Sequence, residues 1–471
     1  MQTAETIHSA SGLAASGTTS GPSRVLGLGS AVMLIVGVVV GAGIFKAPSM
    51  VAGMAGSVEW MFAAWALGGL MSLAGALCYA ELATTYPHAG GDYHFLGRAF
   101  GRHVAFLFGW ARFSVITTGS IALLAFVFGD YMQQVVPLFG GTAWGSAAYA
   151  AAAVLVLWAV NARGIVAGTS AQNWLTAAEV GGLLLLVVAA LYTVGGSQTA
   201  PAAVETAGAT PGVASFGLAM VFVLLTYGGW NEAAYMSAEM RRNVDMVRAL
   251  VGSIVLITLL YLLVNWAYWR GLGLQGMARS DALAADLMRG AFGRTGEQVI
   301  SVLVAIAAIT SMNATMIVGA RTNYAIGRDW PLLSRLALWD GRRGSPANAM
   351  LVQNLAALLL VGVGAWAGGG FRSMVEFTAP VFWLFFLLSG IALFVLRWRE
   401  PSTPRPFRVP LYPVLPLVFC ATCGYMLWSS LSYVGGQNIG GFNAAWIGVA
   451  VLAVGGMLLL ALQSLRTAPS T

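Results

Sequence analysis

Charged residues are scarce in this chain, since only 9% of its 471 residues are Asp, Glu, Lys or Arg. A soluble protein carries roughly 25% of these residues, so this chain has too few polar side chains to cover a water-exposed surface. The deficit also excludes a disordered chain, which combines high charge with few apolar residues. Cysteine is scarce as well, and Cys78, Cys420 and Cys423 all lie inside apolar stretches. A secreted disulfide scaffold is therefore excluded.

Motifs for catalysis and for ATP-driven work are missing too. The sequence contains no Walker loop, no pairing of a nucleophile with a base, and no ligand spacing around its histidines. We therefore expect neither an enzyme nor a resident cofactor or metal. The net charge is +7, but the basic residues lie in short loops between apolar runs. That placement is typical of a membrane topology signal and not of nucleic-acid binding.

Apolar residues make up 58% of the chain, and the mean hydropathy is +0.78. A membrane-spanning helix needs about 20 mostly apolar residues, and the short alternating segments of a β-barrel are absent. The sequence therefore predicts an all-α membrane protein in contact with the lipid bilayer. The twelve predicted transmembrane helices lie at about 26–47, 58–80, 103–129, 146–162, 172–194, 214–238, 247–269, 297–320, 347–367, 374–396, 409–431 and 442–464.

The predicted organisation is a single transmembrane domain, residues 24–466, between two short tails. Residues 1–23 are rich in Ser, Thr, Ala and Gly, so we expect a disordered cytoplasmic tail and no signal peptide. Residues 467–471 form the second tail. Most basic residues fall in loops on the side of these tails, which predicts that both termini are cytoplasmic and that the chain lies in the cytoplasmic membrane. On the other side, a loop at about 270–296 is expected to fold as a partly amphipathic lid.

Closely spaced glycines interrupt the first and the sixth predicted spans near their middle. Each glycine costs about 1 kcal/mol in a helix interior, so two together favour local unwinding. Unwound backbone at membrane depth is stable only where it lines a cavity. Close packing through small residues is the alternative for either segment alone. The two segments are five spans apart, however, and paired broken helices in two halves of a chain indicate the substrate site of a transporter.

Main-chain groups at such breaks suit an α-amino acid. The N-terminus of a half-helix offers unpaired N–H groups to a carboxylate, and the C-terminus offers carbonyls to an ammonium group or a cation. The small residues Val39, Val40 and Ala42 leave room for a neutral or bulky side chain. The predicted substrate-binding residues are Val40, Gly41, Ala42, Gly43, Ile44, Thr226, Tyr227, Gly228, Gly229 and Trp230.

Several motifs accompany the breaks. The first span contains Gly-Ala-Gly-Ile-Phe at 41–45, followed by Pro48. The second span ends in Ala-Glu-Leu at 80–82, and the sixth contains Tyr-Gly-Gly-Trp-Asn at 227–231. The eighth ends in Arg-Thr-Asn-Tyr-Ala at 321–325. Together they resemble the amino acid–polyamine–organocation (APC) superfamily, in particular bacterial permeases similar to the light chains of L-type amino acid transporters.

The resemblance implies a five-plus-five inverted-repeat (LeuT-like) fold with broken helices 1 and 6. The repeats would cover about 24–195 and 213–396, with extra helices at about 409–464. It also implies alternating access around a site formed by helices one, three, six, eight and ten, and a substrate that is an amino acid or a related amine.

A carboxylate at mid-membrane, Glu179, is the main candidate for ion coupling. Intramembrane charges are costly and indicate function. Many members of the resembled family carry a lysine here, whose ammonium is thought to take the place of a sodium ion. A carboxylate can instead hold a proton or, with the hydroxyls of Thr310 and Ser311, a hard cation. The alternatives are back-bonding of the hydroxyls to their own helix and a protonated or cavity-facing Glu179.

Other polar residues in the spans are weaker candidates. Glu232 follows the second break, where it would bind a substrate ammonium or pair with Arg112, and Asn313 lies in the eighth span. Tyr227 and Trp230 would act as gates over the substrate or as packing residues. Glu81 and Asp92 are expected to form structural ion pairs at the cytoplasmic edge, where Arg98, Arg102 and Arg163 are available.

The sequence thus predicts a secondary active amino acid transporter driven by a proton or sodium gradient. One alternative is a cation-independent exchanger of amino acids or polyamines, in which Glu179 is structural. Another is a membrane sensor or scaffold that binds its ligand without moving it, although the chain has no soluble output domain. No partner subunit is predicted, and neither is a nucleic-acid partner.

Overall fold

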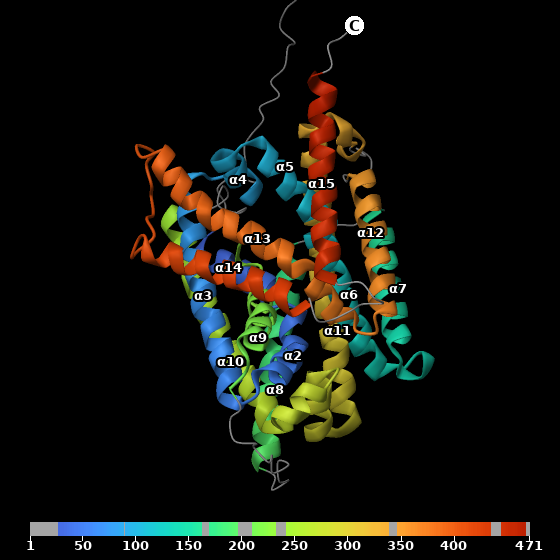
Figure 1. Ribbon diagram of the computed structural model, residues 1–471. Coiled ribbons are helices and arrows are strands. Elements are labelled where there is room, and N and C mark those ends of the chain that lie inside the picture. Colours follow the sequence, from blue (N-terminus) through green and yellow to red (C-terminus); the bar gives the residue numbers. More distant parts are fainter. Residues whose placement is uncertain are drawn as a thin grey trace, which may run out of the picture.

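The computed structural model describes residues 27–88, 90–162, 169–195, 210–231, 242–338, 346–434 and 444–467, and these are helical with short connections and no strand (Figure 1). The first half of the chain contains α1 (Leu28–Val39), η1 (Ala42–Phe45), α2 (Ala47–Ala55), α3 (Val58–Thr85), α4 (Asp92–Phe100), α5 (Arg102–Ala111), η2 (Arg112–Thr117), α6 (Thr118–Val135), η3 (Phe139–Gly141), α7 (Ala143–Ala162) and α8 (Thr169–Gly195). The second half contains α9 (Val213–Thr226), α10 (Asn243–Arg279), α11 (Leu283–Asp329), η5 (Pro331–Ala337), α12 (Ala347–Trp366), α13 (Gly370–Arg399), α14 (Val414–Val434) and α15 (Ala444–Thr467).

Eight helices of the described part are long and apolar enough to cross a membrane, and three shorter apolar helices accompany them at Ala177–Tyr192, Val213–Thr226 and Trp446–Ala461. The prediction of an all-α membrane protein is therefore confirmed. Each predicted span coincides with at least one helix, but the number of twelve spans and the inverted repeat stay predictions.

The bundle is apolar on its outside as well as inside, as expected of a protein whose surroundings are lipid. Large apolar side chains such as Leu259 on α10 and Leu359 on α12 are exposed. Small residues bring the inner helices together. On α3, a Cβ atom at Gly68 or Gly69 would collide with Val223 of α9 or Thr258 of α10, so these glycines permit the close approach of three helices.

The two ends of the bundle differ. Helices α4 and α5 lie at one end, at the top of Figure 1, where α15 also ends. The segment predicted as a lid lies at the opposite end. There α10 bends at Gly273 (φ 66°) and α11 bends at Gly293 (φ 65°), so helical segments fill most of residues 270–296. We call the first end the α4–α5 end and the second the lid end.

Candidate functional site

The first predicted break is present between α1 and α2. Helix α1 ends at Val39, Val40 leaves the helical conformation (φ −76°, ψ 73°), and Gly41 is extended. One turn of 3₁₀ helix, η1, then leads to α2, which begins with Ala47 and Pro48. Proline lacks an N–H group and is well tolerated in the first turn of a helix. The glycine and the proline thus explain locally why this span is two half-helices.

The second predicted break follows α9. The helix ends at Thr226, and the N–H group of Gly228 donates to the carbonyl of Leu225 over 3.0 Å in a tighter turn. Gly229 has φ 106°, a conformation that residues with a side chain rarely adopt, so glycine is required there. Residues 232–241, which include the candidate Glu232 and with it the pairing with Arg112, lie outside the described residues.

The two breaks touch each other and α11. A Cβ atom added to Gly43 would lie 3.4 Å from Cγ2 of Thr226. One added to Gly41 would lie 3.5 Å from Oγ of Ser311. The structure therefore brings together Gly41, Gly43, Thr226 and Ser311, four of the residues that the sequence selected.

A tyrosine that the sequence did not single out connects the two half-helices. The hydroxyl of Tyr261, on α10, lies 2.9 Å from the carbonyl oxygen of Val39 and 3.2 Å from that of Thr226. These are the last residues of α1 and α9. Tyr261 is fully buried. The one signal that the sequence offers for Tyr261 is a polar hydroxyl inside the apolar seventh predicted span.

Tyr227 and Trp230 are both buried among aromatic rings. Tyr227 donates its hydroxyl hydrogen to the carbonyl of Trp65 over 3.0 Å, and its ring lies against those of Trp65 and Tyr261. Trp230 packs against Tyr79, as well as two further rings, Phe386 and Phe419. The cavity beside it has a volume of only about 10 Å³, at most the space of one water molecule. In this conformation both aromatic side chains close the region of the second break.

Glu179 lies on α8 with 3% of its surface exposed, and its Oε2 has no hydrogen-bond partner in the described part of the chain. Helix α8 packs against α1, α10 and α11, the helices that carry the first break, Tyr261 and Ser311. The structure thus places a buried carboxylate, whose Oε2 has no hydrogen-bond partner among the described residues, beside α1, the helix that ends at the first break.

The other coupling candidates are hydroxyls on α11. Thr310 donates to the carbonyl of Ile306 over 2.9 Å, as expected for a threonine in a helix, and keeps its oxygen lone pairs for another donor or a cation. Ser311 is half-buried and faces Gly41. No hydrogen bond joins either hydroxyl to Glu179 among the described residues.

The structure describes two of the weaker candidates, Asn313 and Arg112. Asn313 accepts a hydrogen bond of 2.6 Å from Asn161, which ties α11 to α7. Arg112 is buried and begins η2, a single turn of π-helix between α5 and α6. Such turns are frequent at functional sites.

Buried ion pairs hold both ends of the bundle. At the lid end, Nζ of Lys46 lies 2.7 Å from Asp130 of α6 and donates to the main-chain carbonyl of Asp281 over 2.6 Å. Next to it, Tyr131 donates to the carbonyl of Phe45 over 2.8 Å. We call these residues the lid-end cluster. It ties the half-helix that follows the first break to α6 and to the lid.

At the α4–α5 end, Glu81 accepts hydrogen bonds from Arg397 over 2.7 and 2.5 Å and from the N–H group of Val409 over 2.7 Å. Nε of Arg405 lies 3.4 Å away. The prediction of a structural ion pair for Glu81 is confirmed, but among the described residues its partners are Arg397 and Arg405 and not Arg98 or Arg102, while Arg163 lies outside the described residues. Asp92 is bound by hydroxyls, since Tyr79 and Ser389 donate to it.

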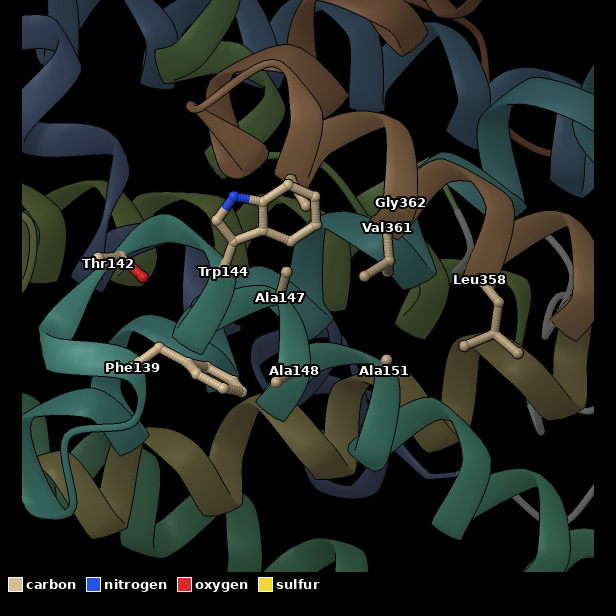
Figure 2. A pocket seen from close by; sticks show the side chains of 10 residues that line it. Phe139, Thr142, Trp144, Ala147, Ala148, Ala151, Leu358, Val361 and Gly362 are labelled. Carbon is tan, nitrogen blue, oxygen red and sulfur yellow. The ribbon is translucent and has the colours of Figure 1, made fainter.

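A further cavity lies away from this site. It has a volume of about 600 Å³ and lies between α7 and α12 (Figure 2). Apart from Thr142, its side chains are apolar, with Phe139 and Trp144 at one end. It has no charged group for a zwitterion, and we do not consider it the substrate site.

Two contacting breaks inside an apolar helical bundle are typical of a membrane transporter. The sequence profile of the amino acid permease family matches residues 26–458. The chain belongs to this family, whose members are membrane transporters of amino acids and not enzymes.

Known mammalian transporters resemble the chain over most of its length. It is 30% identical to the human b(0,+)-type amino acid transporter 1 over 85% of this chain and 81% of that protein. The rabbit b(0,+)-type transporter is 29% identical over 83% and 80%. The rabbit large neutral amino acids transporter small subunit 2 is 30% identical over 86% and 76%. The large neutral amino acids transporter is named as a small subunit, so the absence of a partner subunit for this chain stays a prediction.

Proposed function

We propose that this permease is a secondary active transporter that carries an amino acid across the cytoplasmic membrane by alternating access, in symport with a proton or a sodium ion. Both termini would be cytoplasmic. The backbone of the substrate would bind to main-chain groups at the two breaks, and the walls around Trp230 and Ile44 would contact its side chain.

The observation that carries this proposal is the contact between the two breaks at Gly43 and Thr226. Each break exposes main-chain groups that a helix would otherwise satisfy internally. Because the two breaks are in contact, we expect main-chain groups of both to bind the same α-amino acid. A carboxylate and an ammonium on the same carbon are complementary to that arrangement.

Coupling is assigned to Glu179 together with Thr310 and Ser311. A buried carboxylate without a partner is stable as a neutral acid, or as an anion once a cation arrives. Either form makes binding of the ion and the arrangement of α8 against α1 and α11 depend on each other. This linkage is what symport requires of its coupling residue.

The test is uptake of radiolabelled amino acids into proteoliposomes under an imposed proton gradient or an imposed sodium gradient. We expect one gradient to drive accumulation and Glu179→Gln to abolish that drive while exchange of internal for external amino acid continues. Glu376→Gln is the matched control, because Glu376 is also buried in a span but is paired with Arg372 over 2.8 Å. Its coupling should be unchanged.

Uptake that requires preloaded amino acid, ignores both gradients and is the same in wild type and Glu179→Gln would contradict the symport proposal. It would establish the cation-independent exchanger instead. Binding of amino acids without any uptake would contradict transport altogether and favour a membrane sensor.

A further inference from the structure

The apolar cavity between α7 and α12 lies within two helices that are long and apolar enough to cross a membrane (Figure 2). Its volume is about 600 Å³. On α12 its wall runs from Leu358 to Ala365, which is about 10 Å at a rise of 1.5 Å per residue. The facing wall on α7 is made of small side chains, those of Ala147, Ala148 and Ala151.

The helix faces beside the cavity are apolar and exposed. Leu155 on α7 and Leu359 on α12 are examples. Gly362, in the α12 wall, is exposed too, and a Cβ atom added to it would meet nothing within 4 Å. Water does not fill an apolar cavity, and an empty volume of this size is costly. The hydrocarbon chains that surround a membrane protein are therefore the material that fits this space.

One end of the cavity has a different chemistry. Thr142 and Trp144 carry the polar side-chain groups of the lining, a hydroxyl and an indole N–H. They lie where the α7 span begins, and Trp366 is exposed at the last residue of α12. Tryptophan is enriched at the level of the lipid headgroups. The cavity thus has an apolar body at the depth of the lipid chains and a polar end at the membrane surface.

The polar end is held in a fixed shape. The side chain of Gln133 accepts from the N–H group of Leu138 over 2.6 Å and donates to the carbonyls of Leu138 and Thr142 over 3.3 and 3.2 Å. Phe139 follows with φ 49°, a conformation that residues with a side chain rarely adopt. A site that is already ordered before binding loses less entropy when its ligand arrives.

We propose that this cavity, the α7–α12 groove, binds one acyl chain of a membrane phospholipid, with the headgroup end of the lipid at Thr142 and Trp144. The ester and phosphate oxygens of the lipid accept hydrogen bonds from the hydroxyl and the indole N–H group. A transmembrane helix of another protein fits less well, because it is about 30 Å long and the groove extends over about 10 Å.

Both walls of the groove are fastened to α11. Asn161 of α7 donates to Asn313 over 2.6 Å, and Gln353 of α12 donates to the carbonyl of Met316 over 3.0 Å. A chain bound between α7 and α12 therefore stabilises the packing of three helices. Because a ligand that binds only the folded state raises stability, Tm reports its binding.

The first experiment uses the full chain in vesicles of phosphatidylethanolamine and phosphatidylglycerol, with a small fraction of phosphatidylethanolamine that carries a diazirine on one acyl chain. After irradiation, labelled residues are mapped by mass spectrometry. Ala148→Phe fills the groove from α7 and Gly362→Phe fills it from α12. Ala159→Phe is the matched control, because Ala159 is exposed on α7 outside the lining. We expect labels concentrated on the groove lining in wild type and Ala159→Phe, and their loss in both filled variants.

The second experiment measures Tm of delipidated protein in detergent as phosphatidylethanolamine is added. Tm of wild type and Ala159→Phe should rise and saturate, whereas Tm of the filled variants should not respond. Gly362→Phe decides the outcome if Ala148→Phe does not fold, since its Cβ atom meets no neighbour. Labels spread evenly over all exposed apolar faces would show bulk lipid only and overturn the proposal. Equal labelling and equal Tm responses in filled and control variants would overturn it as well, and so would a second polypeptide that co-purifies with wild type but not with the filled variants.

Discussion

Two carboxylates of nearly equal burial lie in very different surroundings. Glu81, near the end of α3, is 1% exposed and is held by Arg397, Arg405 and the N–H group of Val409. Glu179, on α8, is 3% exposed, and its Oε2 has no partner in the described residues. The two carboxylates therefore differ not in burial but in whether arginines and N–H groups surround the carboxylate.

The difference separates a structural charge from a functional one. Removing a carboxylate from water costs several kcal/mol, and only partners close by offset that cost. Around Glu81 the offset is permanent, so this carboxylate fixes helices in place. Around Glu179 the described residues provide no such partner for Oε2, which is why we propose that this group binds an ion or proton during transport. The predictions below test this contrast, beginning with the largest expected effect.

Replacing the compensated carboxylate should destabilise the fold strongly. Glu81→Ala leaves two arginines and a main-chain N–H group without their acceptor, which costs about 3–5 kcal/mol when a buried pair is broken. We expect a clear drop in Tm of the purified protein in detergent. Glu59→Ala, an exposed carboxylate at the start of the same helix, is the control and should leave Tm unchanged. If Glu81→Ala lowers Tm no more than Glu59→Ala does, Glu81 and the groups bound to it do not stabilise the fold.

The lid-end cluster offers a buried cation for the same comparison. Lys46→Met removes the partner of Asp130 and the donor to the Asp281 carbonyl, and charged hydrogen bonds contribute about 1.5–3 kcal/mol each. We expect a lower Tm and faster protease cleavage within residues 270–296. Asp281→Asn is the control, because the Asp281 carboxylate is 89% exposed and lies 3.8 Å from Nζ of Lys46, whereas the main-chain carbonyl that Lys46 binds at 2.6 Å is retained. Equal Tm values and equal cleavage rates in the two variants would contradict a stabilising role of Lys46 in the lid-end cluster.

The uncompensated carboxylate should behave in the opposite way. Glu179→Gln and Glu179→Met remove a buried group without a partner, and such replacements are neutral or stabilising. We expect the free energy of unfolding to stay within about 1 kcal/mol of wild type or to rise, while gradient-driven accumulation is lost. A large loss of stability would show that Glu179 is a structural residue, and the contrast with Glu81 would then fail.

The sequence predicted what depends on neighbours along the chain. Both breaks followed from the cost of glycine within an apolar helix, and Glu179 followed from a charge within a span. The partners of Glu81 could not be predicted, because Arg397 is 316 residues away and reaches it only through the packing of α13 on α3. Tyr261 was missed for the same reason. A tyrosine in an apolar span has no pattern, and its role exists only once α1 and α9 end beside it.

The smallest effect is expected for a paired carboxylate, Glu400, whose side chain is 25% exposed. At the α4–α5 end, Arg98 donates to Glu400 over 2.8 and 2.9 Å, and Tyr86 donates over 3.0 Å. These hydrogen bonds, chiefly that of Arg98, hold the pKa of Glu400 below its ordinary value. A depressed pKa stabilises the folded state above the unfolded pKa of about 4.3, and this contribution is lost as the pH falls through the folded value.

We therefore expect Glu400→Gln to lower stability at pH 7 by only about 0.2–1 kcal/mol, as for other exposed pairs. The difference from wild type should shrink below about pH 4, where Glu400 becomes protonated. Tm measured at both pH values, with and without 0.5 M NaCl, is the test, and salt should reduce the difference at pH 7. A pH-independent loss would mean that packing of the side chain matters and its charge does not. Glu81 is also paired with arginine, but it is buried. The ratio of the two losses of stability therefore measures how much burial adds to an ion pair in this protein.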